Sequence, residues 1–164
     1  MEKVNEVLIA LRRIIRATDL HSKYLAKNTG LTAPQMLLLQ TLRNKGEDTV
    51  GALAKEMSLS QATVTTILDR LEKKGLISRE RSTSDRRKVL VYLSDSALDI
   101  LKDAPLPLQD QFTRQFNDLQ EWEQLMLISS LGRIAQMMDA QHIDAAPVLD
   151  VGTLDRQTNI IEEK

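Results

Sequence analysis

Apolar residues recur at helical spacing between positions 60 and 75. Four of them stand at i, i+3, i+4 and i+7 and would form one buried stripe: Val64, Ile67, Leu68 and Leu71. Ser60 is a good N-cap before this stripe, and Lys73, Lys74 and Gly75 after it are typical of a helix end. The pattern therefore predicts an amphipathic helix over about Gln61 to Lys73.

A short helix and an extended hairpin flank this segment. Residues 49–57 place their apolar side chains on one side, and a short turn joins them to the next helix. Beyond that helix, apolar positions alternate along 88–93, and the polar connector 82–87 closes a hairpin. Two short helices, a tight turn and a hairpin predict a winged helix-turn-helix.

Longer apolar stripes occupy both ends of the chain. The N-terminal stripe runs through Val4, Val7, Leu8, Leu11, Ile14, Ile15 and Thr18. After Pro105 and Pro107 a helical pattern resumes, is interrupted at Asn117 and Asp118, and continues through Trp122, Leu125, Ile128, Leu131, Ile134, Ala135 and Met138. These stripes could fold back onto one monomer core or pack against a second copy. The expected fold class is mainly α with a small β-hairpin wing (α+β).

Composition and charge limit the kinds of partner that the protein could bind. A length of 164 residues, 42% hydrophobic and 27% charged, fits one domain with its own core. The whole chain carries −1, but residues 1–59 carry +3, residues 60–94 carry +4 and residues 95–164 carry −8. Between Arg79 and Lys88 there are five cations and two acids. Cations therefore concentrate in the predicted helix and hairpin, which favours attraction of phosphate.

Several function classes find no support in the residues. No apolar run approaches the ~20 residues of a membrane span, and the start does not resemble a secretory signal, so we expect a cytoplasmic protein with no membrane partner. The chain has no cysteine, and His21 and His142 lack metal-ligand spacing, so no metal or cofactor is expected. The common nucleotide-loop, metalloprotease and hydrolase motifs are missing, and we expect no enzymatic activity.

The outward face of helix 61–73 is small and polar near its start. Alanine and threonine methyls suit the thymine methyl, and first-turn N–H groups suit a phosphate. We predict DNA contacts from this helix by Ser60, Gln61, Ala62, Thr63, Thr65, Thr66 and Arg70. Taken alone, this face also fits the polar surface of any amphipathic helix.

The hairpin supplies the second group of candidate contacts. We predict DNA contacts from the wing by Arg79, Arg81, Ser84, Asp85, Arg86, Arg87 and Lys88. The alternative is a solvated hairpin whose charges protect its exposed edge. The arginines can serve both purposes.

The segment from Leu31 to Leu93 resembles the MarR family of bacterial transcription regulators. LTAPQMLLLQTL is similar to the family's second helix, TVGALAKEMSLSQATVTTILDRLEKKGLI to its helix-turn-helix, and SRERSTSDRRKVLVYLS to its wing, with SDRRK the most specific part. The resemblance implies one domain over 1–140, with dimerisation helices at 1–28 and 108–140, the winged helix-turn-helix at 31–93 and a connecting helix at 94–107.

The resemblance also implies a mode of DNA binding. The helix would enter the major groove, and the wing tip would reach the adjacent minor groove. Arg87 would be the minor-groove arginine, since negative potential is enhanced in a narrow groove. Asp85 would hold the wing through an ion pair with a basic neighbour, for which Arg70 is the candidate.

A homodimer on pseudo-palindromic double-stranded DNA follows from the same resemblance, because one helix and one wing bury too little surface for tight binding. The dimerisation residues would be Val4, Val7, Leu8, Leu11, Ile15, Leu131, Ile134 and Met138. We expect a repressor, with a small-molecule effector as a further partner whose binding residues are unknown. A winged-helix protein-interaction adaptor without DNA binding is the alternative.

Residues 141–164 form an extension that lacks the helical stripe. It contains Pro147 and Gly152 and ends acidic, so flexibility is expected. Four apolar residues in it could nevertheless pack onto a partner surface: Val148, Leu149, Val151 and Leu154. The run from Trp122 to Asp150 resembles regulators of compatible-solute synthesis, which implies a response to osmotic stress.

Overall fold

A computed structural model describes residues 1–143 and 145–155. Its helices are α1 (Glu2–Thr29), α2 (Ala33–Lys45), α3 (Val50–Glu56), α4 (Gln61–Lys73), α5 (Asp95–Asp103), α6 (Leu108–Asn117) and α7 (Glu121–Met137). Its strands are β1 (Glu47–Thr49), β2 (Ile77–Arg81) and β3 (Val89–Leu93). The predicted fold class, mainly helical with a small antiparallel sheet, is confirmed.

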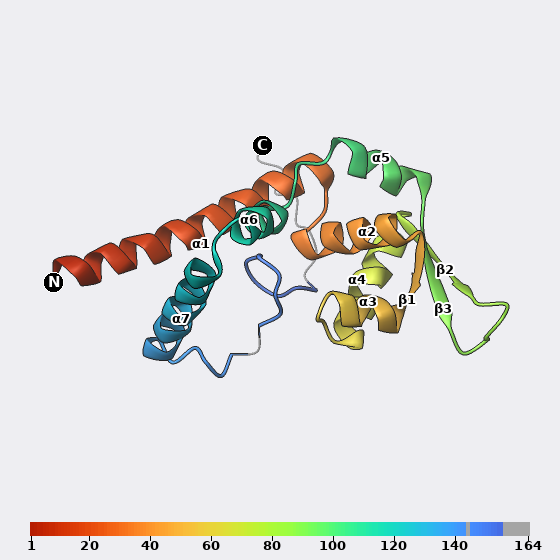
Figure 1. Ribbon diagram of the computed structural model, residues 1–164. Coiled ribbons are helices and arrows are strands. Elements are labelled where there is room, and N and C mark those ends of the chain that lie inside the picture. Colours follow the sequence, from red (N-terminus) through yellow and green to blue (C-terminus); the bar gives the residue numbers. More distant parts are fainter. Residues whose placement is uncertain (144, 156–164) are drawn as a thin grey trace.

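The chain divides into two regions in space (Figure 1). One, which we call the reading lobe, comprises α2, α3, α4 and the three strands. The other, which we call the arm, comprises α1, α6 and α7, with α5 leading into it from the sheet. The hydrophobic core lies in the reading lobe, because the fully buried leucines belong almost entirely to this lobe and the end of α1.

Helix α2 lies at the centre of the reading lobe. Met36, Leu38, Leu39 and Leu42 are fully buried, and the helix contacts α1, α4, α5, β1 and β3. Its start is fixed by a capping box, in which Thr32 and Gln35 each bond the other's backbone N–H. The apolar residues of α2 thus supply part of the surface on which α4 packs.

Helix α4 has the predicted bounds and the predicted buried stripe. Val64, Ile67, Leu68 and Leu71 all have 0% exposure. Ser60 caps the start by accepting a hydrogen bond from the Thr63 N–H at 3.1 Å. Gly75 adopts a φ of 70° just beyond the end, where a side chain would be strained, and turns the chain into β2.

The sheet contains one strand more than the hairpin that the sequence predicts. β2 and β3 pair antiparallel from Ile77 with Leu93 to Arg81 with Val89. β1 pairs with the other edge of β3, so the order is β1-β3-β2. Thr49, predicted to begin a helix, instead ends β1 and caps α3 by accepting from the Ala52 N–H at 3.2 Å.

The connecting helix is shorter than predicted. The resemblance implied residues 94–107, but α5 ends at Asp103 and Ala104 is extended, because Pro105 disfavours helical backbone in the residue before it. The predicted interruption at Asn117 and Asp118 is confirmed as the break between α6 and α7. None of the described helices has the length and apolar character needed to cross a membrane.

The C-terminal extension makes contacts with the arm over its described part. The Ser22 hydroxyl of α1 donates to Asp150 Oδ1 at 2.7 Å, and the Leu149 N–H donates to Gln109 Oε1 of α6 at 3.2 Å. Flexibility was expected for residues 141–164. For residues 156–164 this expectation lies outside the described part of the chain.

Candidate nucleic-acid interface

The outer face of α4 begins with small and polar side chains. Gln61, Ala62 and Thr65 are exposed, whereas Thr63 and Thr66 are half-buried. Burial of the opposite stripe on α2 fixes which face turns outward. The candidate residues of the helix therefore lie together at its first two turns, except Arg70, which lies one turn further along.

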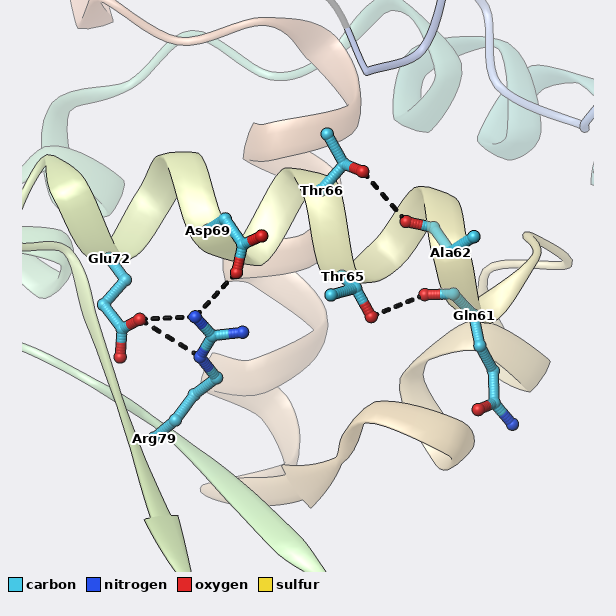
Figure 2. A network of polar contacts seen from close by, with 7 residues as sticks. All are labelled: Gln61, Ala62, Thr65, Thr66, Asp69, Glu72 and Arg79. Carbon is cyan, nitrogen blue, oxygen red and sulfur yellow. Dashed lines mark hydrogen bonds and ion pairs between the residues drawn. The ribbon is translucent and has the colours of Figure 1, made fainter.

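Two threonines of this face, Thr65 and Thr66, form hydrogen bonds to the backbone of their own helix (Figure 2). The Thr65 hydroxyl donates to the Gln61 carbonyl at 2.8 Å, and the Thr66 hydroxyl donates to the Ala62 carbonyl at 3.0 Å. Such bonds to the preceding turn fix the side-chain rotamer. Because the hydroxyl protons are occupied, a partner meets methyl groups and oxygen lone pairs in fixed positions.

Ser60 holds the first turn of the same face. Besides capping the Thr63 N–H, its Oγ lies 2.8 Å from Thr63 Oγ1. The two hydroxyls therefore form one hydrogen-bonded pair at the helix start. Anionic groups are favoured at this end of a helix, where the dipole is positive.

Arg79 of β2 connects the wing to α4 (Figure 2). Its Nη2 donates to Asp69 Oδ1 at 2.7 Å and to Glu72 Oε2 at 2.5 Å, and its Nε donates to Glu72 Oε2 at 3.1 Å. The hydrogen bond from Arg79 lowers the pKa of Glu72, and the bond to Glu72 raises the pKa of Arg79. This arrangement, which we call the Arg79 bridge, fixes the wing relative to the reading helix.

The wing tip is closed by hydrogen bonds around Ser82 and Asp85. The Ser82 N–H donates to the Lys88 carbonyl at 3.0 Å, and the Lys88 N–H donates to the Asp85 carbonyl at 2.9 Å. The Asp85 N–H donates to Ser82 Oγ at 3.3 Å, and Ser84 Oγ lies 2.9 Å from the same oxygen. Ser82 is buried, so the base of the tip is anchored in the lobe.

Asp85 acts on the backbone of the tip. The prediction that it forms an ion pair with Arg70 is wrong, because no salt bridge joins these two described residues. The Asp85 carboxylate instead accepts the Arg87 N–H at 3.1 Å. A short-range bond to the chain two residues on is typical of aspartate in turns. Arg70 itself is half-buried on α4, and its Nη1 has no hydrogen-bond partner among the described residues.

The cations at the tip are exposed. Arg81, Arg86, Arg87 and Lys88 form no ion pair within the described part of the chain, in contrast to Arg79. The structure thus separates the five cations of the predicted wing into one that bridges to α4 and four that face solvent. Ser84 is exposed beside them.

The sequence did not reveal the Arg79 bridge or the role of Ser82. Asp69 and Glu72 are spaced i, i+3 on α4, a signal that they share a side of the helix. Their partner lies on a strand whose position depends on the β2–β3 register. Ser82 carries no signal of burial in its polar surroundings.

The predicted dimerisation residues lie on the arm and are largely exposed. Val4, Leu8 and Ile15 are 61%, 55% and 62% exposed on α1. Leu131 of α7 and Met138 just beyond it are 50% and 63% exposed. Val7 is also exposed, whereas Leu11 and Ile134 are half-buried. Helices α6 and α7 have no buried residue, so their apolar side chains find no full cover within the described chain.

These features define a class of protein, a winged helix-turn-helix whose reading helix and wing form one polar, cationic surface. Residues 31–89 match the model of the MarR family. The chain is 29% identical over 130 residues to an uncharacterized HTH-type transcriptional regulator of Bacillus subtilis, YcgE, covering 79% of this chain and 84% of that protein.

Solved structures agree with this assignment. The chain resembles Bordetella bronchiseptica BpsR, described for regulation of its DNA binding by 6-hydroxynicotinic acid, with a TM-score of 0.53, 27% identity and coverage of 79% of this chain and 98% of that chain. It shares the fold of a mutant MarR from Escherichia coli complexed with operator DNA, with a TM-score of 0.55, 24% identity and coverage of 80% and 95%. The winged helix-turn-helix of this chain thus matches the MarR family over residues 31–89, and the solved structures share its fold.

Replacing Glu72 with glutamine should destabilise the protein at neutral pH but not in acid. Because Arg79 holds the pKa of Glu72 below its ordinary value in the folded state, the stabilisation from this pair is complete above about pH 5 and is lost as the pH falls through the lowered pKa. Thermal unfolding of both proteins across this range measures the difference. Glu80→Gln, an exposed wing position, is the control and should lack the pH dependence. An equal loss for Glu72→Gln at both ends of the range would contradict the Arg79 bridge.

Asp85 should be replaceable by asparagine but not by alanine. Asparagine retains an Oδ1 that can accept the Arg87 N–H, whereas alanine removes the acceptor. Native-state amide exchange at Arg87 should therefore be several-fold faster in Asp85→Ala and close to wild type in Asp85→Asn. Equal exchange in both variants would show that the carboxylate does not order the tip.

Proposed function

We propose that this protein is a homodimeric transcription repressor that reads double-stranded DNA with α4 in the major groove and the wing tip in the adjacent minor groove. The observation that carries the proposal is the Arg79 bridge, which joins β2 of the wing to Asp69 and Glu72 of α4, the helix whose start is small and polar. A helix and a wing in fixed relation suit adjacent grooves of one duplex.

The predicted contacts divide by role in this proposal. Gln61, Ala62 and Thr65 would meet base edges, since short side chains allow close approach and methyl groups fit thymine. Arg87 would enter the minor groove, with its backbone held by Asp85. Arg79 would act through the helix that it bridges, because two acids already occupy its guanidinium.

Charge supports the same orientation. Residues 60–94 carry eight basic and four acidic residues, whereas residues 95–164 carry five and thirteen. Residues 95–164 lie outside the reading lobe, so phosphate attraction favours the reading lobe over this part of the chain. The tip cations add to this attraction because no acid of the described chain neutralises them by pairing.

The exposed apolar faces of the arm support a second copy as the partner. Contiguous exposed apolar surface on α1 and α7 indicates an interaction site. A two-fold interface uses the same faces on both chains and would place two reading lobes on a pseudo-palindrome, with half-sites about 34–36 Å apart.

Two finer assignments remain predictions. BpsR, whose DNA binding is regulated by 6-hydroxynicotinic acid, supports a small-molecule effector by analogy. The response to osmotic stress rests on the sequence resemblance of residues 122–150, and none of the proteins compared above supports it. A protein-interaction adaptor without DNA binding is the competing function, and the free tip cations favour DNA over it.

Arg87→Ala should weaken binding to the DNA upstream of the protein's own gene by about tenfold to a hundredfold. Losing one cationic contact in each wing should also flatten the slope of log K against log salt by about 1 per wing. Fluorescence anisotropy over a salt series measures both. Arg114→Ala, an exposed cation of α6, is the matched control and should leave affinity and slope unchanged. Absent or salt-independent binding of the wild type would refute the DNA-binding function and favour the adaptor.

Leu131→Glu should convert the dimer to a monomer, because it places a charge in the apolar face of α7. Size-exclusion chromatography with light scattering should report twice the chain mass for wild type and a single chain mass for the variant. Leu98→Glu on α5, also partly exposed, is the control and should stay dimeric. A monomeric wild type at micromolar concentration would contradict the half-site geometry.

A further inference from the structure

The described part of the C-terminal extension lies between the arm and the reading lobe. In Figure 1 this segment, drawn in blue, passes between α6 and α7 on one side and α3 and α4 on the other. Hydrogen bonds attach it to the arm, among them those from Ser22 to Asp150 and from Leu149 to Gln109. We call the described residues 141–143 and 145–155 the C-terminal strap.

The strap also reaches the start of the reading helix. Thr63 lines an open cavity of about 500 Å³ whose remaining walls belong to the strap, among them Ala146, Val148, Asp150, Leu154 and Asp155. Thr63 is half-buried, unlike its neighbours Gln61 and Ala62. A single segment therefore contacts α1 and α6 and faces the first turn of α4.

The strap carries negative charge near the start of α4. The described residues of the strap include two acids, Asp150 and Asp155, and neither lysine nor arginine. The start of α4 is the positive end of the helix and the place where a DNA phosphate would lie. The acidic strap and the DNA backbone therefore compete for the same region through the same kind of charge.

We propose that the C-terminal strap is autoinhibitory: it is held to the arm at Ser22 and Gln109, lies over the start of α4, and must leave for full DNA binding. This inference rests on the DNA-binding function proposed above. The strap and DNA would both occupy the region beside Thr63, so a competing interaction would shift the balance between the docked and released states. DNA and the docked strap are then mutually exclusive ligands of the same helix start.

A reversible covalent lock tests the proposal on the full chain. The chain has no cysteine, so Ser22→Cys combined with Asp150→Cys introduces a single thiol pair at positions whose side-chain oxygens are 2.7 Å apart. Thiol titration and mass spectrometry under non-reducing conditions would verify a disulfide within one chain. The oxidised protein should bind its upstream DNA at least tenfold more weakly than the same protein after reduction.

A single substitution tests whether release of the strap strengthens DNA binding. Ser22→Ala removes the donor to Asp150 and keeps every acid of the strap. Release of the strap should tighten DNA binding several-fold relative to wild type. Ser96→Ala, at an exposed position of α5, is the control and should bind like wild type.

The outcomes distinguish a failure of the autoinhibition proposal from a failure of the DNA-binding proposal. Equal affinity in the oxidised and reduced forms, with Ser22→Ala unchanged, would overturn autoinhibition while leaving DNA binding intact. Where the two thiols do not join, Ser22→Ala decides the question, and an unchanged affinity in that variant overturns autoinhibition. Absence of DNA binding by wild type and by the reduced protein would overturn the proposed function and the inference together.

Discussion

Burial of one apolar stripe of α4 in the core formed with α2, α3 and β2 controls the rest of the reading lobe. Val64, Ile67, Leu68 and Leu71 are fully buried, and this burial determines which face of α4 remains outside. Apolar burial contributes roughly 1.5–3 kcal/mol per large side chain, far more than the surface contacts around it. With the helix fixed, Gly75 sends the chain into β2 at a set point, and the Arg79 bridge then fixes the wing.

Electrostatic pairing within the lobe decides which charges are left for a partner. Asp69 and Glu72 would repel phosphate if unpaired, but Arg79 pairs with both, offsets one of their two negative charges and also holds β2 to α4. The cations at the tip have no such acid within the described chain and remain exposed. One arginine therefore suppresses an unfavourable charge and positions four favourable ones.

The arm differs from the lobe because its apolar side chains are not covered. Trp122, Leu125 and Ile128 of α7 are 64%, 58% and 60% exposed, more than a monomeric protein usually leaves on one contiguous face. Only Thr18 and Leu25 of α1 are buried. The exposed apolar residues of the arm are typical of one side of a protein–protein interface. The C-terminal strap passes between the arm and α4.

Local signals in the sequence predicted the elements that local chemistry controls. The bounds of α4 followed from Ser60, the stripe and Gly75, because capping and positive φ depend on neighbouring residues. The break between α6 and α7 was foreseen at Asn117 and Asp118. β1 was missed because a three-residue strand is defined by its pairing with β3, and its own side chains show little pattern.

The sequence by itself determined the winged-helix class, the reading face and the cationic tip, since periodicity, caps and charge are properties of adjacent residues. Only the tertiary structure decided the pairings across elements. It assigned Arg79 to Asp69 and Glu72, gave Asp85 a backbone partner in place of Arg70, and brought the strap to Thr63. Each of these depends on strand register or helix packing, which bring together residues that no local spacing connects.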